Sequence, residues 1–206
     1  CADEGRANRA DDPMIAPTRV FDDVHALGRT GTVVWALTTP DGILLIDAGY
    51  PDQLETMLLP GLRAVGLDPA DVKYVLVAHG HADHWGAASY FQQRGARVAL
   101  SAADWDLVEN PQPIPGVPAA AAGSAPAGLP PPRRDVVVAD GDVIEFGVVR
   151  ITTVLVPGHT PGALGFVFPV KDGGREHTAG LFGGSILLVN RIPNEGLQQY
   201  VQSLGR

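Results

Sequence analysis

The sequence predicts a single mixed α/β domain that follows a short flexible tail. Three observations support this fold class. Short β-branched apolar runs are bounded by Gly, Pro and Asp, as strands are, whereas other stretches carry apolar residues at helical spacing. The chain has 206 residues, of which 45% are hydrophobic, and this suffices for one substantial core. Residues 1–13 are charged and poor in apolar side chains, so we expect a flexible tail there and the domain over 14–206.

The first half of the domain is expected to alternate between strands and helices. Helices are indicated by apolar residues three and four positions apart, as in Leu54, Met57 and Leu58, and Gly66 and Gly95 mark helix ends. The predicted elements are strands at 20–26, 32–39, 43–47, 73–77 and 97–100 and helices at 53–65, 85–94 and 102–108.

The second half is dominated by strands. Residues 110–134 are rich in Pro, Ala and Gly without periodicity, and so long a segment without regular structure is uncommon in a compact domain. Two interpretations stay open for it: a flap over a functional site, or a plain linker. Strands are expected at 136–138, 143–146, 148–156, 164–170 and 181–189, followed by an amphipathic helix over 196–206.

One short motif concentrates potential metal ligands at the end of a predicted strand. The apolar run 74–78 is followed by His79-Gly80-His81-Ala82-Asp83-His84, which holds three imidazoles and a carboxylate. These groups are the ligands that zinc prefers in sites that keep a position open for water. An accidental His-rich turn is the alternative, but delivery by a strand and the strict spacing favour a metal site.

A second candidate ligand follows another apolar run. His159 comes after the run 154–156 and stands between Pro157-Gly158 and Pro161-Gly162. Glycine lets the backbone pass close to a metal, and proline stiffens the loop that presents the ligand. Alone, a His in such a turn is more often a turn residue than a ligand. Beside the first motif, the ligand role is favoured.

Together these motifs resemble the metallo-β-lactamase superfamily of hydrolases, whose pattern is His-x-His-x-Asp-His followed by Gly-His-Thr. The resemblance includes the strand that ends in Asp47-Ala48-Gly49 and the Gly141-Asp142 turn, and it covers about residues 20–206. It implies a four-layer αββα sandwich, in which two central sheets are flanked by helices. Composition and periodicity alone indicate only a mixed α/β domain.

The resemblance also assigns roles to single residues. It implies that His79, His81 and His159 form a first zinc site, and that Asp83 and His84 belong to a second. Asp83 would also act in catalysis by orienting the nucleophile. Asp47 would support the metal site rather than bind metal; the alternative is a strand-end residue that caps a turn.

Two departures from the family pattern bear on the second site. Ser185 stands where many relatives have an Asp that bridges both metals, and serine there resembles the third subclass of class B metallo-β-lactamases and their non-lactamase relatives. The resemblance gives Ser185 a supporting role through hydrogen bonds; a small residue at a strand start is the alternative. That subclass has one further His after this position, whereas no His follows His177 here. We therefore expect two zinc ions, a second site that lacks one His, and a fold without its C-terminal part.

The resemblance implies a zinc-dependent hydrolase that acts on a small-molecule amide or ester. Zinc lowers the pKa of a bound water towards ~7, so that hydroxide attacks a carbonyl. A β-lactamase, the class associated with antibiotic resistance, is expected first; a lactonase or esterase, or a metal-binding protein without turnover, are the alternatives. Trp85, next to the first motif, either walls the pocket or belongs to the core.

Charge and cysteine content bear on partners and location. The net charge is −8 without a basic stripe, so we expect a small-molecule substrate and no nucleic acid. No apolar stretch reaches the about 20 residues that span a bilayer. The single cysteine, Cys1, resembles the start of a mature bacterial lipoprotein, which implies the periplasm or cell envelope. An arbitrary chain start and a cytoplasmic location are the alternative.

Overall fold

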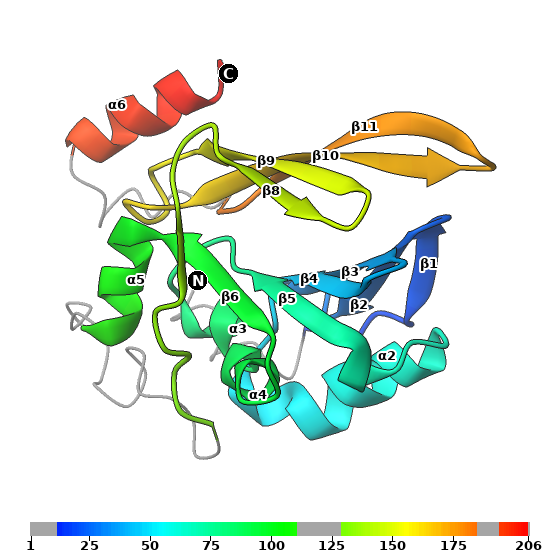
Figure 1. Ribbon diagram of the computed structural model, residues 1–206. Helices are drawn as coiled ribbons and strands as arrows, with labels where there is room; N and C mark the ends of the chain where they lie inside the picture. The colour runs from blue at the N-terminus through cyan, green and yellow to red at the C-terminus, as the bar shows by residue number, and fades with distance from the viewer. Residues whose placement is uncertain (1–11, 111–128, 185–193, 206) are drawn as a thin grey trace.

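The chain folds into two facing β-sheets with helices outside them, as the computed structural model shows for residues 12–110, 129–184 and 194–205 (Figure 1). The larger sheet has the strand order β1-β2-β3-β4-β5-β6-β7 and the smaller one the order β11-β10-β9-β8. The strands are β1 (Thr18–Phe21), β2 (Val24–Gly28), β3 (Val33–Thr39), β4 (Gly42–Ile46), β5 (Val72–Leu76), β6 (Arg97–Ser101), β7 (Val136–Val138), β8 (Val143–Phe146), β9 (Val149–Leu155), β10 (Leu164–Asp172) and β11 (Arg175–Phe182).

The larger sheet changes from antiparallel to parallel pairing at β4. Strands β1 to β4 are joined by short turns and pair antiparallel, whereas β4, β5, β6 and β7 pair parallel. Parallel neighbours require crossover connections, which here carry the helices. The carboxyl ends of β4, β5 and β6 therefore lie at one edge of the sheet, and residues that follow these strands come together there.

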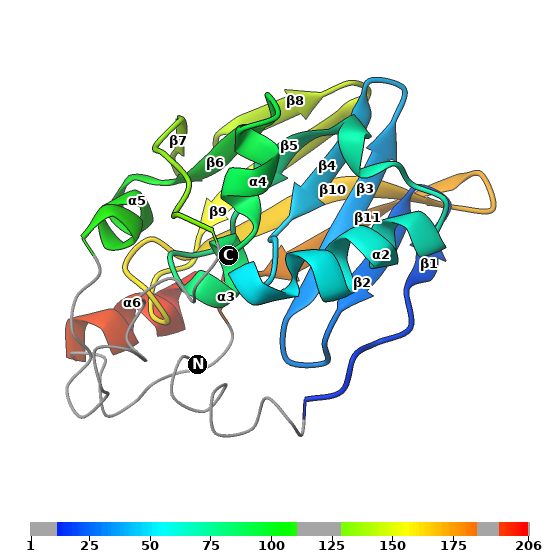
Figure 2. The same cartoon turned by 90° about the horizontal axis from the view of Figure 1, so that it is seen from below.

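The helical segments lie mainly on the outer face of the larger sheet. Seen from below, α2, α3 and α4 lie across this sheet and α5 to one side, while α6 lies beside one end of the smaller sheet (Figures 1 and 2). No helix among the described residues is long and apolar enough to cross a membrane. The segments are 3₁₀ turns η1 (Pro51–Gln53) and η3 (Pro69–Asp71), a π-helical turn η2 (Leu54–Leu58), and the helices α2 (Leu59–Ala64), α3 (Ala82–Trp85), α4 (Ala88–Gln92), α5 (Ala102–Glu109) and α6 (Asn194–Ser203).

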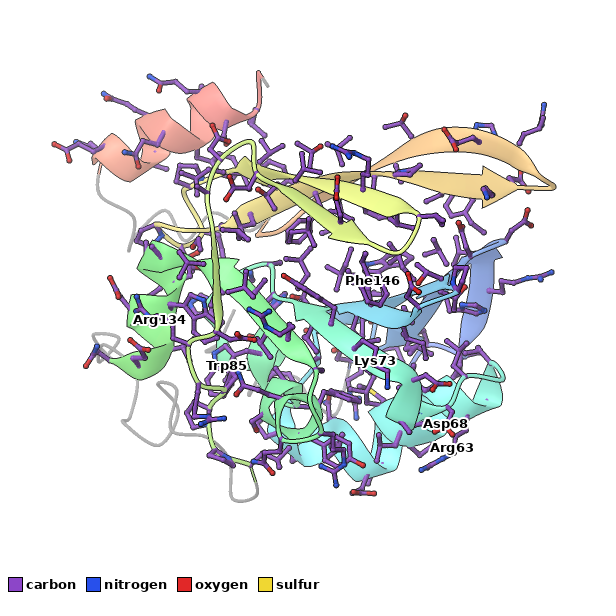
Figure 3. All side chains as sticks on the ribbon, viewed as in Figure 1. Arg63, Asp68, Lys73, Trp85, Arg134 and Phe146 are labelled. Atoms are coloured by element: carbon purple, nitrogen blue, oxygen red, sulfur yellow. The ribbon has the colours of Figure 1, made fainter. Side chains whose placement is uncertain are left out.

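Two hydrophobic cores hold these layers together. One fills the space between the helices and the larger sheet, and the other fills the space between the two sheets. In β4, Leu45 belongs to the first core while Leu44 and Ile46 belong to the second, which explains why this strand is apolar throughout. Phe146 enters the second core from β8, with its ring centroid 6.2 Å from that of Tyr74 (Figure 3). The αββα arrangement is thus confirmed.

Three predicted elements were wrong in detail. The single strand expected at 20–26 is the hairpin of β1 and β2, because Asp22 and Asp23 turn the chain and accept hydrogen bonds from Gly174 N–H and Lys171 N–H near the β10–β11 turn. The single helix expected at 85–94 is interrupted between α3 and α4, where Gly86 packs so closely on Pro51 that a Cβ would overlap it.

The third error concerns the last strand. A strand was expected at 181–189, but β11 begins at Arg175 because Gly173 and Gly174, with φ of 57° and 78°, make a tight turn after β10. His177 is exposed on this strand. The proposed flap over 110–134 falls largely in residues 111–128, which lie outside the described residues, as do Cys1 and Ser185.

Candidate metal centre

The first ligand motif lies at the carboxyl edge of the parallel strands. Strand β5 ends at Leu76 and its parallel neighbour β4 ends at Ile46, so His79 and Asp47 emerge side by side. Residues Asp83 and His84 lie on the short helix α3, which starts immediately after His81. The parallel pairing therefore places the whole motif beside the end of β4.

The second motif reaches this edge from the smaller sheet. It lies in the loop between β9 and β10, and the backbone N–H of Leu164 at the end of this loop donates to the carbonyl of Ala78, at 2.8 Å. Gly158 has φ 145°, and a Cβ there would lie 2.6 Å from the Cβ of Tyr200 on α6. The glycine before His159 thus permits close packing of Tyr200 of α6 on this loop.

Four imidazoles converge where the two motifs meet. Possible ligand atoms of His79, His81 and His159 all lie within 4.8 Å of one another, and the same holds for His79, Asp83 and His84. The ring centroid of His79 lies 4.9 Å from that of His81, 4.5 Å from that of His159 and 3.8 Å from that of His84. The five predicted ligands therefore form two adjacent groups, with His79 between them.

Among the candidate ligands, His79 gives the clearest indication of a bound ion. It is 1% exposed, and both of its ring nitrogens are buried without a hydrogen-bond partner among the described residues. Buried polar atoms are nearly always paired, so two orphaned nitrogens in one ring indicate a missing partner such as a metal ion. The donor sets around His79, three imidazoles on one side and two imidazoles with a carboxylate on the other, are those that zinc binds.

In the group formed by His79, His81 and His159, the pKa values of the first two imidazoles favour cation binding. Burial, together with repulsion from the neighbouring rings, holds the pKa of His79 well below its ordinary value. Burial and the proximity of His159 lower the pKa of His81 to about 3, and its Nδ1 lies 3.0 Å from Nε2 of His159. His79 and His81 are therefore neutral at pH 7, which is the form of imidazole that binds metal.

Asp47 fixes His84 at the second group. Its Oδ2 lies 2.7 Å from Nδ1 of His84, and its Oδ1 accepts the backbone N–H of Ala78 at 2.8 Å. The other ring nitrogen of His84, Nε2, lies 3.7 Å from Oδ2 of Asp83. Asp47 is buried and has φ 65°, a backbone conformation uncommon for a non-glycine residue. These contacts orient the His84 ring with Nε2 towards Asp83.

The same contacts set the charge of His84. Burial lowers the pKa of this imidazole, but the carboxylates of Asp47 and Asp83 outweigh that effect and raise it to about 9. Without a metal, His84 is therefore a cation at pH 7 that sits between two carboxylates. A divalent ion at this group would have to displace that proton.

Asp104 at the start of α5 was missed by sequence reasoning. Its carboxylate is fully buried and accepts hydrogen bonds from the N–H of Gly80, the hydroxyl of Thr160 and the N–H of Gly162. Burial raises the pKa of this carboxyl, and the three hydrogen bonds oppose that effect. The sequence showed only an acidic residue in the first turn of a helix, after Ser101, which caps the N–H of Asp104.

A cavity of about 460 Å³ opens beside the imidazoles, between the two sheets. Asp47, His79, His84 and His159 form its polar end. The rest of its lining is largely apolar and comes from both sheets, including Phe21, Val24, Val33, Trp35, Phe168, Val170, Ala179, Leu181 and Phe182. Trp85 belongs instead to the core on the helix side of the larger sheet (Figure 3), which decides between its two expected roles.

The fold and the paired histidine motifs match a known family. A family model described as the metallo-beta-lactamase superfamily matches residues 27–173, well over half of the sequence. The chain therefore belongs to the metallo-beta-lactamase superfamily, whose members are metal-dependent hydrolases, and the expected resemblance is confirmed.

Solved structures of β-lactamases have the same fold. The chain superposes on BJP-1, a subclass B3 metallo-beta-lactamase of Bradyrhizobium japonicum, with a TM-score of 0.78 and 25% identity, covering 93% of this chain and 72% of that one. For a beta-lactamase from Chitinophaga pinensis the TM-score is 0.77 and the identity 29%, covering 93% of this chain and 73% of that one.

Two curated relatives are named as enzymes other than β-lactamases. The chain is 30% identical over 167 residues to N-acyl homoserine lactonase AttM of Azorhizobium caulinodans, covering 77% of this chain and 62% of that protein. It is 28% identical over 191 residues to acyl-coenzyme A thioesterase MBLAC2 of Gallus gallus, covering 84% of this chain and 65% of that protein. The chain thus spans less than two thirds of the length of these relatives.

Proposed function

We propose that this protein is a zinc-dependent hydrolase of a small-molecule amide or ester. One observation carries the proposal: four imidazoles and a carboxylate from two distant chain segments converge around His79, whose two nitrogens are buried and unpaired among the described residues. The family of the chain supports the same chemistry.

Each residue of the candidate site would have a distinct role in such a reaction. His79, His81 and His159 would hold the first ion, and Asp83 with His84 would hold a second. When bound, zinc supplies a Lewis acid and a water that is acidic enough to ionise near neutral pH. The Asp83 carboxylate, 5% exposed, would orient the attacking water and accept its proton, and Asp47 keeps the His84 ring in place.

A β-lactam is the first candidate substrate. The structural likeness to a subclass B3 metallo-beta-lactamase and to the Chitinophaga pinensis beta-lactamase supports it, with TM-scores of 0.78 and 0.77 over 93% of the chain. The serine pattern at Ser185, which lies outside the described residues, also favours this subclass.

An acyl-bearing lactone or thioester is the second candidate. The apolar cavity between the sheets leads away from the imidazoles and has room for an alkyl chain. Two curated relatives, named as an N-acyl homoserine lactonase and an acyl-coenzyme A thioesterase, also favour a substrate with an acyl chain.

Turnover assays separate these candidates. Nitrocefin, a long-chain and a short-chain N-acyl lactone, and an acyl thioester would be tested on zinc-loaded and zinc-free protein, with His79→Ala as the control. Hydrolysis that requires both zinc and His79 is expected for at least one substrate. Zinc bound without turnover of any of them would contradict the hydrolase proposal and favour a metal-binding protein without turnover.

A cavity variant tests the choice between the two classes. Phe168 lines the apolar part of the cavity and is 5% exposed. If the acyl chain lies there, Phe168→Ala raises KM for the long-chain lactone and leaves that for the short-chain lactone nearly unchanged. Equal effects on both lactones would exclude this cavity as the acyl site.

A further inference from the structure

We propose that Asp104 is a positioning residue for the candidate metal centre. Its carboxylate joins the loop that carries His79 and His81 to the loop that carries His159, and so fixes the three imidazoles relative to one another before a cation binds. The inference rests on the proposed metal-dependent function only in its consequence for metal affinity; the joining of the two loops is a property of the chain itself.

The hydrogen bonds that the Asp104 carboxylate accepts come from these two loops. Oδ2 accepts the N–H of Gly80, the residue between His79 and His81, at 2.8 Å, and also the hydroxyl of Thr160, the residue after His159, at 2.6 Å. Oδ1 accepts the N–H of Gly162 at 2.8 Å. One oxygen thus contacts both motifs at once, although Gly80 follows a strand of the larger sheet and Thr160 lies in a loop of the smaller sheet.

Only a carboxylate satisfies all three donors. Gly80 and Gly162 each present an N–H, and an N–H cannot accept a hydrogen bond. In Asp104→Asn, one of the two carboxylate positions becomes an NH₂ group that faces at least one of these N–H groups. Because Asp104 is fully buried, water does not replace the lost bond, and an unpaired buried donor is costly.

The two glycines provide a second, independent observation. A Cβ at Gly162 would overlap Oγ of Ser101 and lie 2.7 Å from Oδ1 of Asp104. A Cβ at Gly80 would lie 2.9 Å from the backbone carbonyl oxygen of Asp104. Both ligand loops therefore need glycine at the point where they touch the start of α5, which explains a glycine in each motif.

The peptide after Gly80 is held from its other side as well. Nε1 of Trp85 donates to the carbonyl oxygen of Gly80 at 2.9 Å, while Asp104 accepts the N–H of the same residue. The residue between His79 and His81 is thus fixed at both its donor and its acceptor. Asp104 belongs to neither group of candidate ligands, so it acts through these loops and not on the ion.

The first test compares Asp104→Asn with Asp106→Asn. Asp106 lies on the same helix, with 71% of its side chain exposed, and serves as the matched control. Loss of a group that orients ligands typically weakens metal binding about 10- to 100-fold. We expect this loss of affinity for the first zinc ion in Asp104→Asn, measured by competition with a chromophoric chelator, and a changed Co²⁺ absorption spectrum. An affinity and spectrum equal to those of wild type would overturn the proposal.

A second pair of variants keeps the test decisive if Asp104→Asn folds poorly. Thr160→Val removes the hydroxyl that donates to Asp104, whereas Thr160→Ser keeps it. The proposal expects Thr160→Val to weaken zinc binding and Thr160→Ser to restore most of the affinity. It also expects Asp104→Asn and Thr160→Val to be non-additive when combined, because they break the same contact. Equal affinities of the Val and Ser variants would contradict it.

A readout without metal separates this inference from the proposed function. In the zinc-free protein, Asp104→Asn is expected to speed hydrogen exchange at the amides of Gly80 and Gly162 and to shift the ring resonances of His81 and His159, while Asp106→Asn does neither. If wild type bound no metal, the hydrolase proposal would fail, yet these signals would still decide whether Asp104 joins the loops. Unchanged exchange at both glycines would refute it.

Discussion

The contact between Asp47 and His84 makes the stability of the metal-free protein depend on pH. Burial lowers the pKa of His84, but Asp47 and Asp83 outweigh it and raise this pKa from 6.5 to about 9. A pKa raised in the folded state gives a stabilising contribution that is complete below pH 6.5 and lost as the pH rises through 9. Removing the Asp47 charge should therefore destabilise the protein at low pH and much less at high pH.

The magnitude follows from the size of the shift. At 1.36 kcal/mol per pKa unit, the rise from 6.5 to about 9 corresponds to about 3 kcal/mol. Linkage gives about 2–3 kcal/mol at pH 7 and well under about 1 kcal/mol at pH 9.5. Asp47→Asn keeps an amide oxygen for the N–H of Ala78 but has no charge. We expect it to lower the free energy of unfolding by about 2–3 kcal/mol at pH 6 and by less than about 1 kcal/mol at pH 9.5.

The assay is urea denaturation of the chelator-treated protein at pH 6, 7.5 and 9.5. Asp71→Asn, at an exposed position, is the control and should change stability little at any of these pH values. An equal loss at pH 6 and pH 9.5 for Asp47→Asn would show that shape rather than charge is responsible. No loss at pH 6 would refute the ion pair altogether.

Three further predictions concern packing and metal removal. Trp105→Ala should lower the free energy of unfolding by about 3–5 kcal/mol in urea denaturation, because this side chain is fully buried; a loss below 1 kcal/mol would contradict its place in the core. Gly183→Ala should lower the free energy of unfolding by about 1–3 kcal/mol, because its Cβ would overlap the carbonyl oxygen of Leu164. Gly180→Ala is the control and should be nearly neutral, since a Cβ there would meet nothing within 4 Å. Equal losses in the two variants would contradict this reasoning. Zinc at 100 times its Kd should stabilise the metal-free protein by about 2.7 kcal/mol and raise its Tm. Neither zinc added together with excess chelator nor zinc added to His79→Ala should give this rise, and a rise in either case would contradict the assignment.

Much of the site could be predicted from the sequence because its ligands follow strand ends. The run before His79 and the run before Asp47 form parallel neighbours, and parallel strands bring their carboxyl ends to one edge. Local patterns therefore sufficed to place the first motif. The pattern around His159 favoured a ligand role only because the first motif was also present. What brings this loop to the first motif is visible only in the structure, where the N–H of Leu164 donates to the carbonyl of Ala78.

The helix break and the role of Asp104 depend on contacts between residues far apart in the sequence, which local patterns do not indicate. The break between α3 and α4 is set by close packing of Gly86 on Pro51, far away in the sequence. The local sequence indicates only that Asp104 is an acidic residue in the first turn of a helix. Its hydrogen-bond partners Gly80 and Thr160 lie 24 and 56 residues away in the sequence. Its role could only be found once the fold had brought the start of α5 against both ligand loops.

The central claim is that His79, His81, His159, Asp83 and His84 form one metal centre. The most direct measurement is zinc stoichiometry and affinity for the chelator-treated chain, compared with those of His79→Ala. We predict that wild type binds zinc tightly, at up to two ions per chain, and that His79→Ala loses the tighter ion. Zinc binding that is absent in wild type, or unchanged in His79→Ala, would contradict the account.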